Sequence, residues 1–172
     1  MNLSLAKNYF GQVFDFSISN TDQMGIDKDI KQAKFRNTQN KAMVNIMFTH
    51  AWMVDHIKNF VKSENITPQQ YNILRILRGA GEPLSTLQLR ERMLDKMSDT
   101  SRIVDRLIAK GLVKKGTCKK DRRLVDVSIT DKGKKLLEKM EPCNEQMESI
   151  FKILSEKEAL TLNILLDKLR NS

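Results

Sequence analysis

Lysine and arginine residues are concentrated in one stretch of ten residues, and two further arginines lie on a predicted helix just before it. Six of the ten residues from Lys114 to Arg123 are basic. These six are Lys114, Lys115, Lys119, Lys120, Arg122 and Arg123. Upstream, Arg102 and Arg106 lie one helical turn apart, and a planar guanidinium matches the two acceptors on the major-groove edge of guanine. The chemistry predicted here is binding of a polyanion; the alternative is a set of solvated side chains without a partner.

The excess of positive charge is confined to the middle of the chain. The 172 residues carry a formal charge of +9. Residues 66–135 hold 17 basic and 8 acidic side chains, whereas residues 1–65 carry +2 and residues 136–172 carry −2. A confined basic region is typical of a surface that binds nucleic acid. A basic face without a partner and an anionic membrane surface are weaker alternatives, the latter because these residues do not follow one long amphipathic helix.

Several classes of protein are disfavoured by what the sequence lacks. We find no run of about 18 apolar residues and no secretory signal pattern, so we expect a cytoplasmic protein. Cys118 and Cys143 show no CxxC spacing, and His50 and His56 are six residues apart rather than at the spacing of a chelating pair. No glycine-rich phosphate loop or GxSxG motif is present. We therefore expect neither an enzyme nor a cofactor or metal site.

Three helix starts are marked by Ser or Thr followed three residues later by Gln or Glu, a pattern that satisfies two backbone N–H groups. Thr67 opens a helix over Gln69 to Gly79, with Pro68 at its first position. Ser85 and Ser155 open helices that end near residues 94 and 169. The apolar spacing also predicts a helix of about 25 residues from Asn37 to Lys62.

In the rest of the chain, segments with the apolar spacing of a helix alternate with segments that show the two-residue alternation of a strand. A helix from Ser98 to Lys110 ends at Gly111, and residues 112–118 and 124–129 form the strands of a basic hairpin. Thr130 then begins a helix that Pro142 should kink or split. The order is helix, helix, short strand, helix, helix, hairpin, helix, helix. The predicted class is mainly α, with a minor β component: a winged helix-turn-helix with a two-stranded wing in a helical frame.

The helix over Ser98 to Lys110 is polarised. Its core side is predicted to carry Thr100, Ile103, Val104, Leu107 and Ile108. Its other side is predicted to present Ser98, Arg102, Asp105, Arg106 and Ala109. Ser98, Thr100 and Ser101 begin the helix, where hydroxyls and backbone donors can hold phosphates. In the hairpin tip, Asp121 either orients Arg123 or serves as a simple turn residue.

The stretches over residues 101–113 and 121–133, which read SRIVDRLIAKGLV and DRRLVDVSITDKG, closely resemble the MarR family of bacterial transcriptional regulators. The resemblance implies a homodimeric winged-helix repressor that binds a palindromic duplex operator. It implies that Ser98 to Lys110 is the recognition helix and Arg123 the wing arginine, with Asp121 as its partner. The DNA-binding set is then Ser98, Thr100, Ser101, Arg102, Arg106, Lys119, Lys120, Asp121, Arg122 and Arg123.

The resemblance also implies a division of the chain. We expect an arm or short helix over residues 1–35, a dimerisation helix over 36–65, the DNA-binding lobe over 66–130 and further dimerisation helices over 131–172. A small effector, such as an anionic aromatic compound, would release the DNA. Its pocket is assigned to Met47, His50, Val54 and Met147, although a methionine stripe is also typical of plain core. A DNA-coating architectural protein without sequence preference, and a winged helix used for protein contacts, stay open as alternatives.

Overall fold

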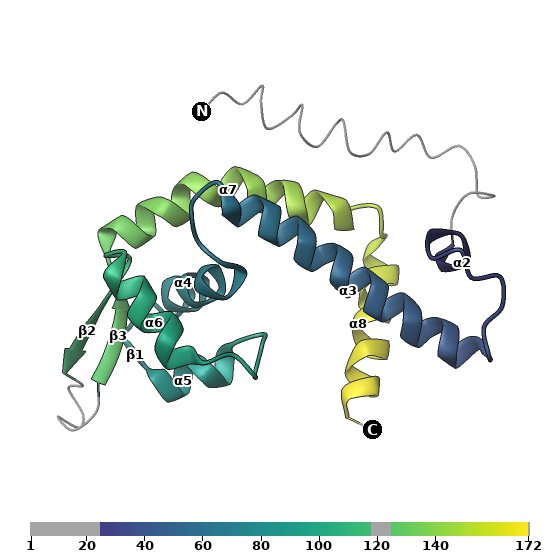
Figure 1. Ribbon diagram of the computed structural model, residues 1–172, viewed down its shortest axis with the longest axis horizontal. Helices are drawn as coiled ribbons and strands as arrows, with labels where there is room; N and C mark the ends of the chain where they lie inside the picture. The colour runs from purple at the N-terminus through teal and green to yellow at the C-terminus, as the bar shows by residue number, and fades with distance from the viewer. Residues whose placement is uncertain (1–24, 118–124, 172) are drawn as a thin grey trace. The chain divides into compact units, whose positions relative to one another are not determined.

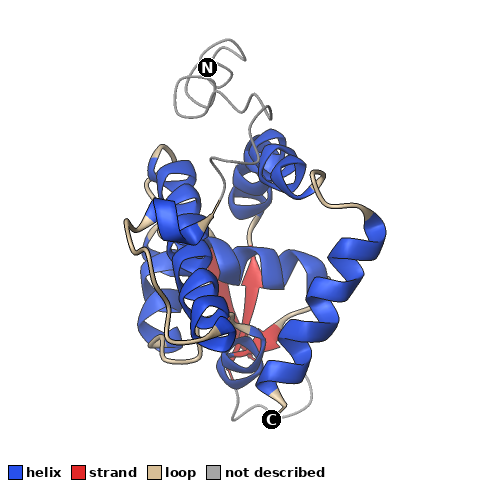
Figure 2. Cartoon of the chain, turned by 90° about the vertical axis from the view of Figure 1, so that its right-hand side faces the viewer, coloured by secondary structure: helices blue, strands red, loops and turns tan. Residues whose placement is uncertain are grey.

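The computed structural model describes residues 25–117 and 125–171, except for the side chains of residues 117, 143 and 146. The described part is mainly helical and carries one small sheet (Figures 1 and 2). Two compact units divide at the middle of helix α3 (Thr38–Lys62), one over residues 1–53 and the other over residues 54–172. The predicted long helix over Asn37 to Lys62 is confirmed to within one residue.

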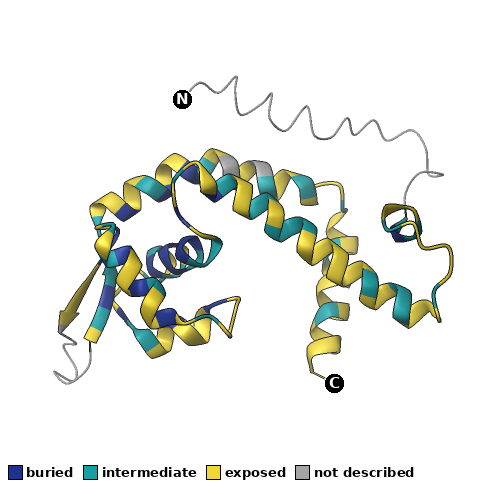
Figure 3. Ribbon diagram, in the orientation of Figure 1, coloured by how far each residue is buried: buried dark blue, intermediate teal, exposed yellow. Residues whose placement is uncertain are grey.

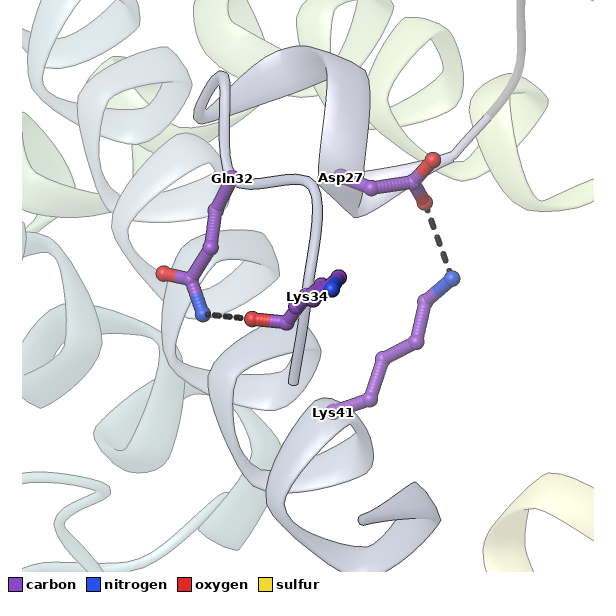
Figure 4. A network of polar contacts seen from close by, with 4 residues as sticks. All are labelled: Asp27, Gln32, Lys34 and Lys41. Carbon is purple, nitrogen blue, oxygen red and sulfur yellow. Dashed lines mark hydrogen bonds and ion pairs between the residues drawn. The ribbon is translucent and has the colours of Figure 1, made fainter. Parts of the chain in front are cut away.

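The first unit contains the short helix α2 (Ile26–Asp29) and the first part of α3. The Lys41 ammonium lies 2.8 Å from a carboxylate oxygen of Asp27, and this hydrogen bond holds the pKa of Asp27 below its usual range (Figure 4). Gln32 donates to the carbonyl of Lys34 at 3.0 Å in the same network. A short helix is thus present within the predicted 1–35 segment, of which residues 1–24 lie outside the described part.

Three helices of the second unit begin where the capping pattern predicts. All three predicted capping boxes form, with the side-chain oxygen and the backbone N–H of the cap both bonded to the third residue of the helix. The helices that they open are α4 (Pro68–Ala80), α5 (Thr86–Arg92) and α8 (Glu156–Arg170). The remaining two are α6 (Thr100–Ala109) and α7 (Asp131–Phe151). Gly111 follows α6 with a φ of 69°, as its predicted capping role requires.

The sheet has three antiparallel strands in the order β1-β3-β2. Strands β2 (Val113–Thr117) and β3 (Val125–Ile129) form the predicted hairpin, in a register that pairs Val113 with Ile129 and Thr117 with Val125. The short β1 (Leu84–Ser85) joins the free edge of β3. The predicted hairpin is therefore present, and the predicted short strand before it adds a third strand along β3.

The core of the second unit lies between α4, α6, the sheet and the first half of α7 (Figure 3). Its largest fully buried side chains come from each of these elements, from α5 and from the end of α3. They include Val61, Ile73, Leu74, Leu77, Leu84, Leu89, Val104, Leu107, Val113, Leu137 and Met140. Tyr71 packs edge-on against Phe60, with 5.5 Å between the ring centroids, and its hydroxyl donates to the buried amide oxygen of Asn144. Burial raises the pKa of Tyr71.

Helix α7 continues through Pro142 without a break, so the split that was one of the two predicted outcomes does not occur. Proline removes one hydrogen bond and crowds the preceding turn, at a cost of about 3 kcal/mol. Buried residues on both sides of the proline offset this cost. Leu137 and Met140 precede it in the core, and Asn144 follows it in the contact with Tyr71.

Replacing Gly133 in the first turn of α7 by alanine should destabilise the fold. A β-carbon at this position would lie 2.3 Å from the carbonyl oxygen of Leu112 and 2.8 Å from Cγ1 of Ile129, so the backbone must shift. We expect Gly133→Ala to lower the free energy of unfolding by about 1–3 kcal/mol, measured by urea denaturation.

Gly79→Ala is the matched control. Gly79 lies in α4, and a β-carbon there would meet nothing within 4 Å. Because alanine is the better helix former by about 0.5–1 kcal/mol, this substitution should leave the protein equally or more stable. Equal effects of the two substitutions would contradict the close approach of α7 to Leu112.

Candidate nucleic-acid interface

Helix α6 has one buried and one exposed side, as its sequence predicts. Thr100, Val104 and Leu107 are buried, and Ile103 and Ile108 are half-buried against the core. The exposed side carries Ser101, Arg102, Asp105, Arg106 and Ala109. The helix is therefore held by its apolar side and offers both arginines to a ligand.

The N-terminus of α6 is built around the carboxylate of Asp99. One oxygen of Asp99 accepts the backbone N–H of Arg102 at 3.1 Å, which caps the helix. The other oxygen lies 3.2 Å from Nε of Arg102. Because this ion pair uses Nε, the Nη1 and Nη2 nitrogens of Arg102 are left for paired hydrogen bonds. Asp99 was missed as the cap because the helix was predicted to begin at Ser98, whereas it begins at Thr100.

A second ion pair joins helix α6 to the hairpin strand β2. Nζ of Lys115 on β2 lies 2.8 Å from a carboxylate oxygen of Asp105 on α6. The pair links two parts of the predicted interface that are ten residues apart. Lys114 and Lys115 at the base of the wing are exposed. The remaining predicted wing residues, Lys119, Lys120, Asp121, Arg122 and Arg123, lie outside the described residues, as does Cys118.

The connection between α5 and α6 is a hydrogen-bonded turn centred on Asp95. Its carboxylate accepts the hydroxyl of Ser98 at 2.6 Å and the backbone N–H of Met97 at 3.0 Å. These bonds, that of Ser98 first, hold the pKa of Asp95 below its usual range. The predicted phosphate ligand Ser98 thus donates its hydroxyl hydrogen within the turn.

An open hollow of about 400 Å³ lies between this turn and the starts of α5 and α6. It is lined by Thr86, Leu87, Arg90, Lys96, Met97, Ser98, Asp99, Thr100 and Ser101. Only Ser98, Thr100 and Ser101 were predicted from the sequence. The others were missed because a hollow depends on how two helices pack against each other. The spacing of apolar residues along the sequence does not reveal that packing.

Thr100 was predicted both for the core side of α6 and as a phosphate ligand, and the structure supports the first role. The residue is 4% exposed, and its hydroxyl faces the sulfur of Met93 at 3.3 Å. The core-side prediction for Thr100 is therefore confirmed, and its role as a phosphate ligand stays a prediction. Ser101 beside it is exposed.

The four predicted effector-pocket residues fall in both units. Met47 and His50 belong to the first and are exposed, whereas Val54 and Met147 belong to the second and are half-buried. Their grouping stays a prediction. Over residues 25–117 and 125–171, no three His, Cys, Asp or Glu side chains gather in a way that could hold a metal ion. No helix in these ranges has the length and apolar character of a membrane span.

The sequence of the winged-helix lobe matches known proteins. The MarR family model matches residues 64–124, which include α4, β1, α5, α6 and β2. The HTH-type transcriptional repressor MdtR of Bacillus subtilis (strain 168) is 36% identical over 73 residues, which is 42% of this chain. The chain spans 46% of the length of that relative.

Solved structures share the fold over most of the chain. A MarR transcription factor from Planctomyces limnophilus is 29% identical with a TM-score of 0.58, over 81% of this chain and all of that one. The DNA-binding protein BpsR of Bordetella bronchiseptica is 23% identical with a TM-score of 0.68, over 81% of this chain and 99% of that one. A mutant of MarR from E. coli, solved in complex with operator DNA, is 24% identical with a TM-score of 0.64, over 72% and 89%.

The family match covers the segment that carries the polarised helix and the first wing strand, and the fold agrees well beyond that segment. The segment over residues 64–124 therefore matches the MarR family, and the chain shares its fold with a MarR transcription factor over most of its length.

Proposed function

We propose that this protein is a transcriptional regulator that binds one duplex DNA sequence as a homodimer, and that it represses transcription until an effector releases it. The observation that carries the proposal is the exposed side of α6, where Arg102 and Arg106 stand on a helix whose opposite side is buried. A recognition helix in the major groove needs this arrangement, with its N-terminal residues toward the base edges.

Around α6, basic residues are placed to hold the phosphate backbone. Arg90 and Lys96 line the hollow at the start of the helix, and Lys114 is exposed at the base of the wing. Phosphate contacts fix the register of a protein on the duplex, whereas base contacts specify its sequence. The operator complex of E. coli MarR supports this proposal through the shared fold.

The proposed dimer rests on apolar side chains of α8. Leu162, Leu165 and Leu169 recur at spacings of three and four residues and so share one side of the helix. All three are exposed, as are Leu160 and Ile164. Such a helix is typical of a face that a second copy covers. A two-fold dimer then requires a palindromic site, with its half-sites about one DNA turn, roughly 34 Å, apart.

The proposed effector response concerns the class of compound that releases the DNA. Regulation of BpsR by 6-hydroxynicotinic acid supports an aromatic acid as the class of effector. An effector acts only through its different affinity for the DNA-binding and the released states.

The proposed function is tested by selecting bound sequences from random duplex DNA with the full chain. A regulator should enrich one palindromic sequence and keep its footprint there under excess competitor DNA. A coating protein would enrich no sequence, and its footprint would fade in proportion to the competitor.

Arg102→Ala should relax the selected sequence at one position in each half-site. Loss of paired hydrogen bonds to one base costs about 1–3 kcal/mol of discrimination. The measurement is a repeat of the selection, with affinities for single-base variants of the site. Arg170→Ala is the matched control, because Arg170 forms the same kind of ion pair with Asp167 three residues earlier in α8. A uniform loss of affinity for all sequences would instead assign Arg102 to a phosphate.

Affinity for the operator should fall steeply with salt. If about 6 to 10 phosphates are contacted, the equilibrium constant should drop by about 10³ to 10⁵ between 50 and 200 mM salt, because bound counterions are released. Fluorescence anisotropy over this range measures the slope. A flat response would contradict duplex DNA as the ligand.

Leu165→Glu should dissociate the dimer, because a carboxylate in an apolar interface loses its hydration without gaining a partner. Analytical ultracentrifugation should show monomers and a much weaker affinity for the full palindrome. Asn163→Glu places the same charge on an exposed polar position of α8 and should leave the dimer intact. Unchanged association of Leu165→Glu would remove this face of α8 from the dimer.

A further inference from the structure

Two apolar side chains stand exposed beside the recognition helix. Met97 is 93% exposed and Leu87 is 63% exposed, and both line the hollow at the starts of α5 and α6. Met97 lies two residues before the cap of the recognition helix, and Leu87 is the second residue of α5. Neither helps to build the core, so a packing role does not explain them.

The hollow that contains these side chains is suited to DNA rather than to an apolar partner. Arg90, Lys96 and Ser101 line it together with them. In a helix-turn-helix, the first helix crosses the phosphate backbone and the start of the second helix faces the base edges. An apolar side chain between these two helices would lie among the basic residues that face the phosphates. The apolar group that the major groove offers to it is the 5-methyl group of thymine.

The conformation of Met97 is set before any ligand binds. The carboxylate of Asp95 accepts the backbone N–H of Met97 at 3.0 Å and the hydroxyl of Ser98 at 2.6 Å, which fixes the turn on both sides of the methionine side chain. An unbranched thioether can adapt its shape to a contact once its backbone is fixed. The turn thus presents a flexible apolar group from a fixed point.

We infer that Met97, supported by Leu87, contacts the 5-methyl group of a thymine in each half-site and so sets the base preferred at that position. This inference rests on the proposed function. Each half-site would then contain one base recognised through an apolar contact, in addition to the bases recognised by the arginines of α6. The inference also places part of the sequence preference in the turn rather than in the recognition helix.

The test replaces thymines of the selected operator one at a time by uracil, which removes only the 5-methyl group. For the unchanged protein, uracil at one thymine in each half-site should weaken binding about fourfold, the effect of burying one methyl group. In Met97→Gln, a polar side chain of similar length, binding should no longer distinguish thymine from uracil at that position. Because Met97 is exposed, its replacement should leave the unfolding midpoint unchanged.

Leu94→Gln is the matched control, because Leu94 is exposed in the same connection but does not line the hollow. It should keep the full response to uracil. The inference is overturned if no thymine is sensitive, if Met97→Gln keeps the response, or if Leu94→Gln loses it equally. In each of these cases the operator is still bound, so the proposed function stands. Failure of the unchanged chain to select any duplex overturns the proposed function and this inference with it.

Discussion

The burial of one side of α6 is the constraint on which the proposed interface depends. A helix of ten residues is only marginally stable in water by itself. Val104 and Leu107 anchor it in the core formed with α4 and the sheet. Because the apolar side is fixed, the side of the helix from which Arg102 and Arg106 project is fixed as well. A binding surface on such a helix loses little conformational freedom when it meets its ligand.

Local signals could be predicted from the sequence, and contacts between distant elements could not. Each capping box depends on two residues three positions apart, and the change of period after Gly111 marks the hairpin. Pro142 was harder to interpret, since packing on both sides of it decides whether α7 continues. At the site, the two sides of α6 follow from its period, whereas the pairing of Asp105 with Lys115 and the hollow depend on tertiary packing. Thr100 suited a phosphate ligand by type, but its position placed it in the core.

The two ion pairs on α6 bear on how readily the helix can exchange partners. Asp99 with Arg102 and Asp105 with Lys115 are exposed pairs, and such pairs contribute about 0–1 kcal/mol. Water screens them in the free protein. Breaking these ion pairs to bind a phosphate or a base therefore costs little. The pairs can orient the basic side chains in the free protein and still release them to a ligand.

The start of α7 is bonded directly to the end of α6 and the beginning of β2. The hydroxyl of Thr130 donates to the carbonyl of Gly111 at 2.7 Å, and its backbone N–H donates to the carbonyl of Leu112 at 3.1 Å. The ammonium of Lys132 reaches the carbonyl of Lys110 at 2.8 Å. Three hydrogen bonds thus tie the first turn of α7 to the chain between α6 and β2, so a displacement of α7 at this end would be passed to both of these elements.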